Sequence, residues 1–491
     1  MNRGAASLRP SWDYVYDVVV VGLGAAGAAA AITAAEKGCK VLVVEKTGEG
    51  GGNSKMSAAF ICPDSKDEAV KYITHLKLIE RGKVDEEERK VIEAYVEEAV
   101  GLVDWIKQLG GEVEPGPVIP GYPKQPVGPS FPEIPGSGSM KRYRVSGMEV
   151  RGGESLFKLL MSKVRELGVD VFFNTAAKDL ICVDNEVVGV LAERGGVEVR
   201  IKALKAVVLA CGGFEYSEEL KRTFLGTSLV HGLGNPANTG DGVKMAMKLG
   251  AALWNMDSFA GYPGFKPETT PYAFPIRMWL PAFIYVDKHG NRFMNETAIE
   301  AHISCLPLLY FDPVKLEYPR IPSHVIFDEK NMEAGPLSPH RAVYGEWSAD
   351  NLAELEKGWI VKADTVERLA ERLGLPPNSL KTTVSRYNDT CRRGVDIDFG
   401  RRQDELMPIE GPPFYGIKIW PCVLNTQGGP RRNSRAQVLH ASGKPIKRLY
   451  SAGELGSMWG KLYQSAGNVA ECLAFGRIAG RNASEEAPST A

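Results

Sequence analysis

Three glycines near the N-terminus have a spacing that suits the binding of a pyrophosphate group. Gly22, Gly24 and Gly27 follow the β-branched run 17–21 and precede the alanine-rich stretch 28–37. The first glycine of such a turn permits a tight bend, the second lets the backbone approach the phosphates, and the third lets the helix pack closely on the sheet. The N–H groups at the start of the helix then face the phosphates. The turn therefore predicts a dinucleotide site.

A carboxylate completes this fingerprint. Glu45 ends a second predicted buried strand, 39–44, where it can accept hydrogen bonds from ribose hydroxyls. The strand–helix–strand order is that of a βαβ unit. FAD and NAD both bind to such a unit, so the fingerprint alone leaves the choice between the two dinucleotides open.

Later segments resemble, in order, the blocks of the fumarate reductase/succinate dehydrogenase flavoprotein family. The resemblance runs from about residue 17 to 480, and it includes the segments 45–54, 209–214, 238–242, 291–296, 396–401, 425–429, 437–454 and 467–480. It implies FAD as the cofactor. Family members that attach FAD covalently carry a His where this chain has Lys55. The resemblance therefore implies FAD held without a covalent bond.

The turn and the resemblance together predict the residues that bind the cofactor. In the family, Glu454 binds the ribityl chain, and the helix that opens near Asn468 points at the pyrimidine edge of the flavin, where a helix N-terminus stabilises negative charge. The predicted cofactor-binding residues are Gly22, Gly24, Ala25, Ala26, Gly27, Glu45, Lys46, Gly51, Gly52, Asn53, Ser54, Ser57, Ala210, Cys211, Gly212, Asn238, Thr239, Asp241, Gly453, Glu454, Ser465, Asn468 and Val469.

The chain departs from the fumarate reductases at the residues that handle the substrate. Glu300 stands at the position of their proton-donating Arg, Asn425 at that of a His, and Gln464 at that of a second Arg. A dicarboxylate would be repelled or left unpaired by these three side chains. Fumarate and succinate are therefore not the expected substrates.

The turn at 463–468 resembles that of the 3-ketosteroid Δ4-(5α)-dehydrogenases, although Ala466 stands where those enzymes have a Gly. In those enzymes the residues that match Tyr463 and Ser465 help to bind the ketone of the substrate. A tyrosine hydroxyl at a carbonyl oxygen polarises it and stabilises the enolate. We expect Tyr463 and Ser465 to contact the substrate, the alternative being that they only shape the turn.

Other side chains are weaker candidates for chemistry. His302 could donate a proton and Glu300 could act as acid or base, although a packed His and a solvated Glu are the alternatives. Arg277 could hold an anionic group or only form an ion pair. Arg431 and Arg432 are predicted to be surface charges. Aromatic residues that could form an apolar pocket wall are Tyr262, Trp279, Phe283, Tyr285, Trp420 and Trp459.

Composition excludes several classes of protein. The chain has 491 residues, 44% of them hydrophobic and 24% charged, with a net charge of −1. This balance does not indicate binding to nucleic acid, and no apolar run is long enough to span a bilayer. The eight cysteines form no CxxC pair, so no metal site is predicted. The absence of an apolar stretch in residues 1–16 leads us to expect a cytoplasmic protein.

These side chains must be positioned by an α/β fold. We expect a Rossmann-like FAD-binding domain of the glutathione-reductase type, formed by residues 1–252 and 405–491, with an inserted α+β capping domain at 253–404. Helices are predicted at 86–109, 155–167 and 468–483, and strands at 169–173, 186–193, 198–201, 206–210 and 449–452. The segment 115–148, rich in Pro, Gly and Ser, is predicted to be a surface or lid segment.

The leading hypothesis is hydride transfer between FAD and the α,β-carbons of an apolar carbonyl compound, of steroid or cyclohexanone type, by desaturation or by enone reduction. The chain carries no haem or iron–sulfur signature, so the electron donor or acceptor is expected to be external. One alternative is a flavin-dependent reductase of another unsaturated carboxylic acid. A flavoprotein without catalytic activity is a further alternative.

Overall fold

The predicted βαβ unit opens the chain. A computed structural model describes residues 11–117, 119–124, 128–146, 152–338 and 345–490. In it β1 (Tyr14–Val21) leads through the glycine turn into α1 (Ala25–Glu36), and β2 (Val41–Val44) returns parallel to β1. Residues 18–20 of β1 have no exposed surface because the strand is covered on both faces. This confirms the α/β class.

Eight strands form the sheet that carries this unit. Their order is β19 (Gln437–Leu439), β20 (Pro445–Ser451), β8 (Glu186–Arg194), β9 (Val197–Leu209), β1, β2 and β6 (Asp170–Phe172), and β7 (Thr175–Val183) pairs with β8. The separate strands predicted at 198–201 and 206–210 are one strand, β9. Lys202 interrupts the apolar pattern, but backbone pairing with β8 and β1 continues through it.

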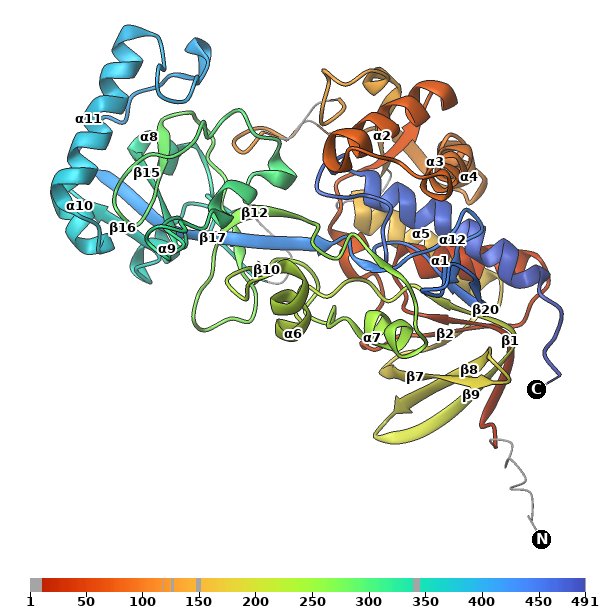
Figure 1. The fold of residues 1–491 in the computed structure, drawn as a ribbon. Coiled ribbons are helices and arrows are strands. Elements are labelled where there is room, and N and C mark those ends of the chain that lie inside the picture. Colours follow the sequence, from red (N-terminus) through yellow and green to blue (C-terminus); the bar gives the residue numbers. More distant parts are fainter. Residues whose placement is uncertain (1–10, 118, 125–127, 147–151, 339–344, 491) are drawn as a thin grey trace.

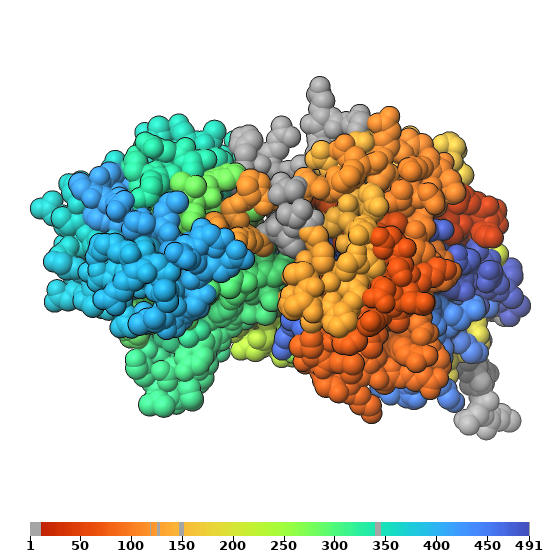
Figure 2. All heavy atoms as spheres, turned by 90° about the horizontal axis from the view of Figure 1, so that it is seen from above, coloured from red at the N-terminus to blue at the C-terminus, as the bar shows by residue number. Residues whose placement is uncertain are grey.

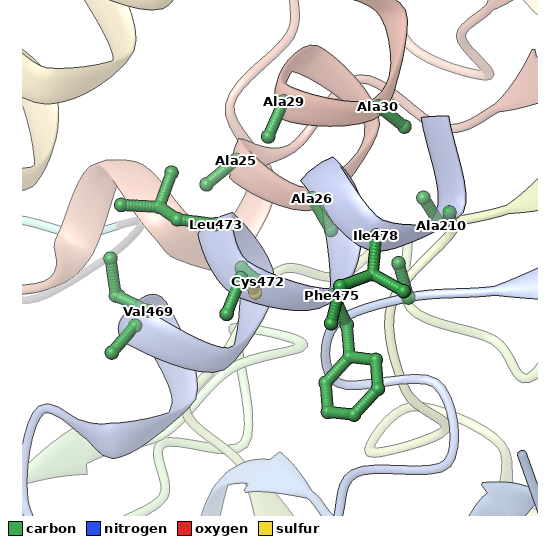
Figure 3. Close-up of a cluster of buried hydrophobic side chains, with 14 of the residues drawn as sticks. Ala25, Ala26, Ala29, Ala30, Ala210, Val469, Cys472, Leu473, Phe475 and Ile478 are labelled. Atoms are coloured by element: carbon green, nitrogen blue, oxygen red, sulfur yellow. The ribbon is translucent and has the colours of Figure 1, made fainter. Parts of the chain in front are cut away.

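Two helices pack so closely on this sheet that only small residues fit between them. α1 lies against the C-terminal helix α12 (Gly467–Glu485), as Figure 3 shows. A Cβ atom on Gly476 would lie 2.5 Å from the carbonyl oxygen of Ala26, and one on Gly480 would lie 2.3 Å from that of Ala30. The alanines and glycines therefore bring the N-terminal ends of both helices to the same part of the molecule.

The molecule has two lobes, which lie side by side (Figures 1 and 2). The eight-stranded sheet belongs to one lobe, and a second sheet forms the other. Its order is β13 (Phe274–Pro275), β12 (Phe259–Phe265), β17 (Phe414–Thr426), β15 (Ser323–Asp328) and β14 (Phe283–Val286), and β10 (His231–Gly232) and β16 (Ile360–Ala363) pair with β17. Helices α8 (Glu329–Ala334), α9 (Leu352–Glu356), α10 (Val366–Leu373) and α11 (Pro377–Arg393) belong to this lobe.

β17 begins ten residues after the predicted end of the capping domain at residue 404. The prediction assigns residues after 404 to the FAD-binding domain, yet β17 is the central strand of the second sheet and pairs with β12 and β15. Figure 1 shows β17 as a long strand that runs from this lobe toward the other. The division at 253–404 remains a proposal, and the pairing of β17 favours a boundary after residue 426.

A three-stranded sheet lies next to α12. It consists of β3 (Phe60–Pro63), β5 (Met140–Ser146) and β4 (Glu112–Pro115), accompanied by α2 (Lys66–Arg81), α3 (Glu86–Ala99), α4 (Leu102–Gln108) and α5 (Gly152–Glu166). Residues 140–146 were expected in a surface or lid segment, but β5 is the central strand of this sheet, with Met140 and Arg142 buried. Residues 118, 125–127, 147 and 148 of that segment lie outside the described residues.

Shorter elements complete the chain. They are η1 (Gly52–Met56), η2 (Ser137–Ser139), α6 (Glu218–Leu220), η3 (Lys221–Leu225), α7 (Asp241–Lys248), β11 (Leu253–Trp254), η4 (Ala301–Ile303), η5 (Leu306–Leu309), η6 (Gln403–Glu405) and β18 (Gly429–Pro430). Among the described residues, no helix is both long enough and apolar enough to cross a membrane. No cluster of His, Cys, Asp and Glu in these residues could hold a metal ion.

Candidate active site

A cavity opens at the carboxyl ends of β1, β2, β9 and β20, which we call the glycine cavity. Most of the predicted cofactor residues line it, namely Gly22, Gly24, Ala25, Ala26, Glu45, Lys46, Gly52, Asn53, Ser54, Ala210, Cys211, Gly212, Asn238, Asp241 and Glu454. Ligands of open α/β sheets bind at this edge, outside the carboxyl ends of the strands.

Backbone geometry shapes the turn. Gly22 has φ +99°, and a Cβ atom there would lie 2.6 Å from the carbonyl oxygen of Ala210. A Cβ atom on Gly27 would lie 2.0 Å from the carbonyl oxygen of Gly22. The Glu45 carboxylate accepts hydrogen bonds from the backbone N–H of Leu23 at 2.8 Å and of Thr47 at 2.9 Å. The turn, the strand and the carboxylate are thus held in one arrangement.

Eight of the predicted cofactor residues do not line the glycine cavity, and four of these, Gly27, Gly51, Thr239 and Gly453, pack close to it. Gly27 and Gly453 allow close packing, since a Cβ atom on Gly453 would lie 2.8 Å from that of Ala26. Gly51 has φ +110° and donates its N–H to the carbonyl oxygen of Leu23. Thr239 accepts a hydrogen bond from Lys46 at 2.7 Å and donates one to Asp241 at 3.0 Å. These four residues hold the lining of the glycine cavity in place through close packing and hydrogen bonds.

Two buried carboxyl groups meet at one end of the glycine cavity. Asn53 Nδ2 donates to Glu215 Oε1 at 2.8 Å and lies 3.0 Å from Glu454 Oε2, and Asn238 Nδ2 donates to Glu215 Oε1 at 2.7 Å. Burial raises the pKa of Glu215 to about 7 and raises that of Glu454, to which the charge of Glu215 also contributes. The sequence prediction missed Glu215, although it directly follows the predicted block 209–214.

A second and larger cavity of about 420 Å³ lies between the two lobes, which we call the tyrosine cavity. It meets the glycine cavity at Asn53, Ser54, Glu454 and Cys472, which line both. Its wall includes the predicted residues Ser57, His302, Tyr463, Ser465, Asn468 and Val469 and the aromatic Tyr262, and most of its exposed lining is apolar. A largely apolar cavity with a few convergent polar groups is typical of a small-molecule site.

The Tyr463 hydroxyl lies at the start of α12. Its oxygen accepts a hydrogen bond from the backbone N–H of Asn468 at 3.3 Å. Burial raises the pKa of Tyr463, so the phenol stays protonated. α12 has no side-chain cap, because Ala466 occupies the N-cap position with φ +66°. The tyrosine therefore keeps its own proton available for a hydrogen bond into the cavity.

A buried polar network holds this turn against the other lobe. Gln464 Oε1 accepts from the Tyr72 hydroxyl at 2.7 Å and from the backbone N–H of Ser130 at 3.0 Å. The Ser130 hydroxyl oxygen accepts from the N–H of Ser465 at 2.9 Å and lies 3.4 Å from Glu300 Oε1. Gln464, which stands where fumarate reductases carry an Arg, is thus fully buried and organises the turn.

His302 and Glu300 form a pair at the wall of the tyrosine cavity. His302 Nδ1 lies 2.8 Å from Glu300 Oε1, and Glu300 Oε2 accepts the His302 backbone N–H at 2.8 Å. The His302 ring contacts Tyr463 and Tyr262, with ring centroids 5.1 and 5.3 Å away. A carboxylate can only accept, so a neutral imidazole that donates to Glu300 through Nδ1 presents Nε2 as an acceptor. The Glu300 side chain is 5% exposed and is not a solvated charge.

Three arginines line the same cavity. Arg142 and Arg144 lie two residues apart on β5 and therefore point to the same side of that sheet. Arg277 donates to the carbonyl oxygens of Pro120 and Ile119, and Arg144 pairs with Glu114. Burial lowers the pKa of Arg142 and of Arg277. Arg142 was missed because residues 115–148 were expected at the surface.

Most of the weaker candidates lie outside the tyrosine cavity. Of the six aromatic candidates only Tyr262 lines the tyrosine cavity. Phe283, Tyr285 and Trp420 pack in the core of the second lobe, Trp279 donates to the carbonyl oxygen of Pro336, and Trp459 packs on Tyr95 and Tyr463. Arg432, expected at the surface, has no exposed surface because it pairs with the buried Glu471. Arg431 is partly exposed and pairs with Asp85.

Comparison with known proteins identifies the fold. Residues 17–469 match the family model described as the FAD binding domain. The chain belongs to this FAD-binding family. It is 29% identical to a 3-oxosteroid 1-dehydrogenase of Mycolicibacterium smegmatis, over 94% of this chain and 96% of that protein.

Two solved structures have the same fold. A 3-ketosteroid Δ1-dehydrogenase of Sterolibacterium denitrificans is 23% identical with a TM-score of 0.82, over 96% of this chain and all of that chain. A flavocytochrome c3 fumarate reductase in its open conformation is 26% identical with a TM-score of 0.74, over 97% of this chain and 79% of that chain. The predicted family resemblance and the FAD-binding fold are confirmed.

The cavities suit FAD. The glycine cavity receives the N-terminus of α1, whose N-cap residue is Gly24 and whose first N–H, on Ala25, donates to Ser54 Oγ at 3.1 Å. The tyrosine cavity receives the N-terminus of α12, so both helix dipoles present positive ends to the joined space. The FAD cofactor predicted from the sequence is confirmed by the family match. The protein is an FAD-dependent oxidoreductase.

Proposed function

We propose that this enzyme transfers hydride between FAD and the α,β-carbons of an apolar carbonyl compound that occupies the tyrosine cavity. The observation that carries the proposal is the pairing of a phenol donor with an imidazole base at one wall. Tyr463 and His302 have ring centroids 5.1 Å apart, and both line a largely apolar cavity that adjoins the glycine cavity. Similarity to a 3-oxosteroid 1-dehydrogenase supports a cyclic ketone as the substrate class.

Tyr463 is proposed to donate a hydrogen bond to the carbonyl oxygen of the substrate. Because Asn468 N–H occupies one lone pair of the hydroxyl oxygen, the O–H points elsewhere. A fixed donor of this kind polarises the carbonyl, makes the α-hydrogen more acidic and stabilises the negative charge that develops on oxygen. Ser465, 2% exposed at the same wall, is proposed as a further contact to the substrate or cofactor.

His302 is proposed to move the proton. With its Nδ1 held by Glu300, Nε2 is the nitrogen that accepts the α-proton during desaturation. FAD, when bound, supplies the N5 atom that accepts the hydride from the β-carbon or, in the reverse direction, donates it. Desaturation thus breaks one C–H bond at each carbon, forms the C=C bond and gives the proton to His302. An external acceptor of electrons is proposed to complete the cycle.

Substitution of Tyr463 by Phe tests the proposal. We expect flavin bleaching by saturated cyclic ketones, or flavin reoxidation by the matching enones, to slow by about 100-fold or more, the usual effect of losing an oxyanion donor. FAD content should stay at the wild-type level because the phenol ring is retained. Stopped-flow absorbance with a panel of steroid and monocyclic ketones measures both. An unchanged rate with any compound that reacts would overturn the role given to the hydroxyl.

One observation favours a second candidate, a flavin-dependent reductase of an unsaturated carboxylic acid. Arg142 is buried at the cavity wall beside Tyr463, Tyr262 and Glu300, and its guanidinium is a suitable partner for a carboxylate. The same ligand panel separates the two candidates when each acid is matched with its methyl ester. Reaction of the acids alone favours this second candidate, whereas equal reaction of neutral ketones and enones favours the first.

A further inference from the structure

Two glutamates face each other where the carboxyl ends of two neighbouring parallel strands meet. β9 pairs with β20 in parallel, Glu215 lies in the turn after β9, and Glu454 lies in the turn after β20. Glu215 has no exposed surface and Glu454 is 8% exposed. Glu454 lines both cavities, so this pair lies at their junction.

The carboxyl groups converge on one point. A Cβ atom built on Gly213 would lie 2.2 Å from Glu454 Oε1 and 2.8 Å from Glu215 Oε2. The donors around the pair are neutral: the Asn53 amide lies near both carboxyls, the Asn238 amide serves Glu215, and the backbone N–H of Thr426 donates to Glu454 Oε1 at 3.2 Å. Among the described residues, no Lys, Arg or His forms an ion pair with either carboxylate.

Two neighbouring buried carboxyl groups without a cation are both ionised only at a large cost in free energy, because their negative charges repel each other strongly. Glu215 Oε2 is buried and accepts no hydrogen bond from the described residues. A proton shared by the two carboxyl groups would leave one charge on the pair and give Glu215 Oε2 a partner.

We propose that one proton is shared between Glu215 and Glu454 and leaves a single negative charge on the pair, so that retention of FAD depends on this shared proton. Glu215 is then a positioning residue, which acts on FAD through Glu454. The inference rests on the proposed contact between Glu454 and the ribityl chain. With one proton on the pair, the remaining carboxylate accepts hydrogen bonds from the ribityl hydroxyls. When that proton is lost, the pair carries two negative charges and repels the anionic cofactor.

Other ionisable groups on the surrounding elements are accounted for. Lys55 on η1 pairs with Glu49 at 2.9 Å, and Asp241 on α7 pairs with Lys46 at 2.9 Å. Burial raises the pKa of Cys211 and of Cys472 to about 12, so these thiols stay neutral. Glu45 accepts backbone N–H groups at the other end of the glycine cavity. Among the described residues in and around the glycine cavity, the Glu215–Glu454 pair is thus the buried carboxyl pair whose charge no cation balances.

The test measures FAD retention by the holoprotein. Protein purified with FAD is diluted stepwise at pH values from 5.5 to 9, and released FAD is measured by its recovered fluorescence. We expect the dissociation constant of the wild type to rise about tenfold or more between pH 6 and 8.5 as the shared proton is lost. Glu215→Gln keeps a hydrogen on this side chain at every pH, so its dissociation constant should change less than threefold.

Two further variants serve as controls for the loss of a carboxylate at other positions. Glu454→Gln should weaken FAD retention at every pH, and Glu219→Gln, which removes an exposed carboxylate that pairs with Lys244, should follow the wild type. A wild-type curve without pH dependence, an equal slope in Glu215→Gln, or loss of FAD from Glu215→Gln at every pH would each overturn the proposal. The readout is independent of turnover, so it stands apart from any failure of the proposed reaction.

Discussion

The glycine cavity and the tyrosine cavity share part of their lining, yet most of the groups that line them are of different kinds. The glycine cavity is lined in large part by backbone and small side chains, including those of the turns 22–26 after β1 and 210–212 after β9. The tyrosine cavity is formed by long side chains from both lobes, among them Arg142 on β5, His302 on η4 and Tyr463 before α12. The glycine cavity therefore depends mainly on backbone geometry, and the tyrosine cavity depends on side chains that meet only when the two lobes pack together.

The buried carboxyl groups follow the same division. In the glycine cavity Glu215 and Glu454 are held by amides, so a proton is the remaining way to balance their charge. At the tyrosine cavity Glu300 faces the imidazole of His302 and is hydrogen-bonded to it. In the Glu215–Glu454 pair the carboxyl groups are proposed to share a proton, whereas Glu300 is proposed to orient the imidazole of His302 as a base.

The largest expected effect comes from Gly27→Ala. The added Cβ atom would lie 2.0 Å from the backbone carbonyl oxygen of Gly22, so α1 must move away from the turn. We expect purified Gly27→Ala protein to contain little FAD and to melt at a lower temperature, since an overpacked core position costs about 1–3 kcal/mol or more. Flavin absorbance and thermal unfolding measure the two effects.

Gly138→Ala is the matched control for this change. Nothing lies within 4 Å of a Cβ atom at Gly138, so its FAD content and melting temperature should equal those of the wild type. Full FAD content and an unchanged melting temperature in Gly27→Ala would contradict the idea that the glycine cavity is fixed by backbone contacts.

The next effect should be confined to the tyrosine cavity. His302→Gln removes the proposed base but no residue of the glycine cavity, so FAD content should stay normal while turnover falls by about 100-fold or more. Glu300→Gln should cost less, because the imidazole remains but its tautomer is no longer fixed by a carboxylate. Flavin reduction rates with a reactive ketone, together with FAD content, distinguish these outcomes.

His75→Gln serves as the control for the histidine change. His75 is partly exposed on α2 and its Nδ1 contacts the carbonyl oxygen of Lys71, away from both cavities, so its loss should leave turnover unchanged. If His302→Gln kept more than half of the wild-type rate, the proton would have to move through another group.

The same division explains how much the sequence could predict. Gly22, Gly24 and Gly27 were predictable because a tight turn near a phosphate requires glycine wherever it occurs. The pair of Arg432 and Glu471 was not, because the two residues come from separate segments and their contact depends on how α12 packs. A lone charged residue in a sequence is most simply placed at the surface.

The tyrosine cavity shows this limit most clearly. Tyr463 and Ser465 were found through a resemblance in a short turn, but Arg142 and Ser130 were missed. The prolines and glycines of residues 115–148 hid β5, in which residues 140–143 alternate between buried and more exposed side chains only once the strand is folded. Only the assembled fold brings β5 of one lobe opposite Tyr262 of the other.

The smallest expected effect is at the rim of the glycine cavity, where side chains replace backbone contacts. Lys46 pairs with Asp241 at 2.9 Å, but the two side chains are 38% and 39% exposed, so solvent weakens the field that reaches the cofactor. Lys46→Gln should raise the dissociation constant of FAD by less than about fivefold at low salt, and by less still in 0.5 M salt, because exposed charges are screened. Lys37→Gln, an exposed lysine at the far end of α1, should have no effect. Fluorescence titration at both salt concentrations measures the difference. A loss of tenfold or more that persists in high salt would mean that Lys46 holds the cofactor directly, and that side chains contribute to the glycine cavity as much as the backbone does.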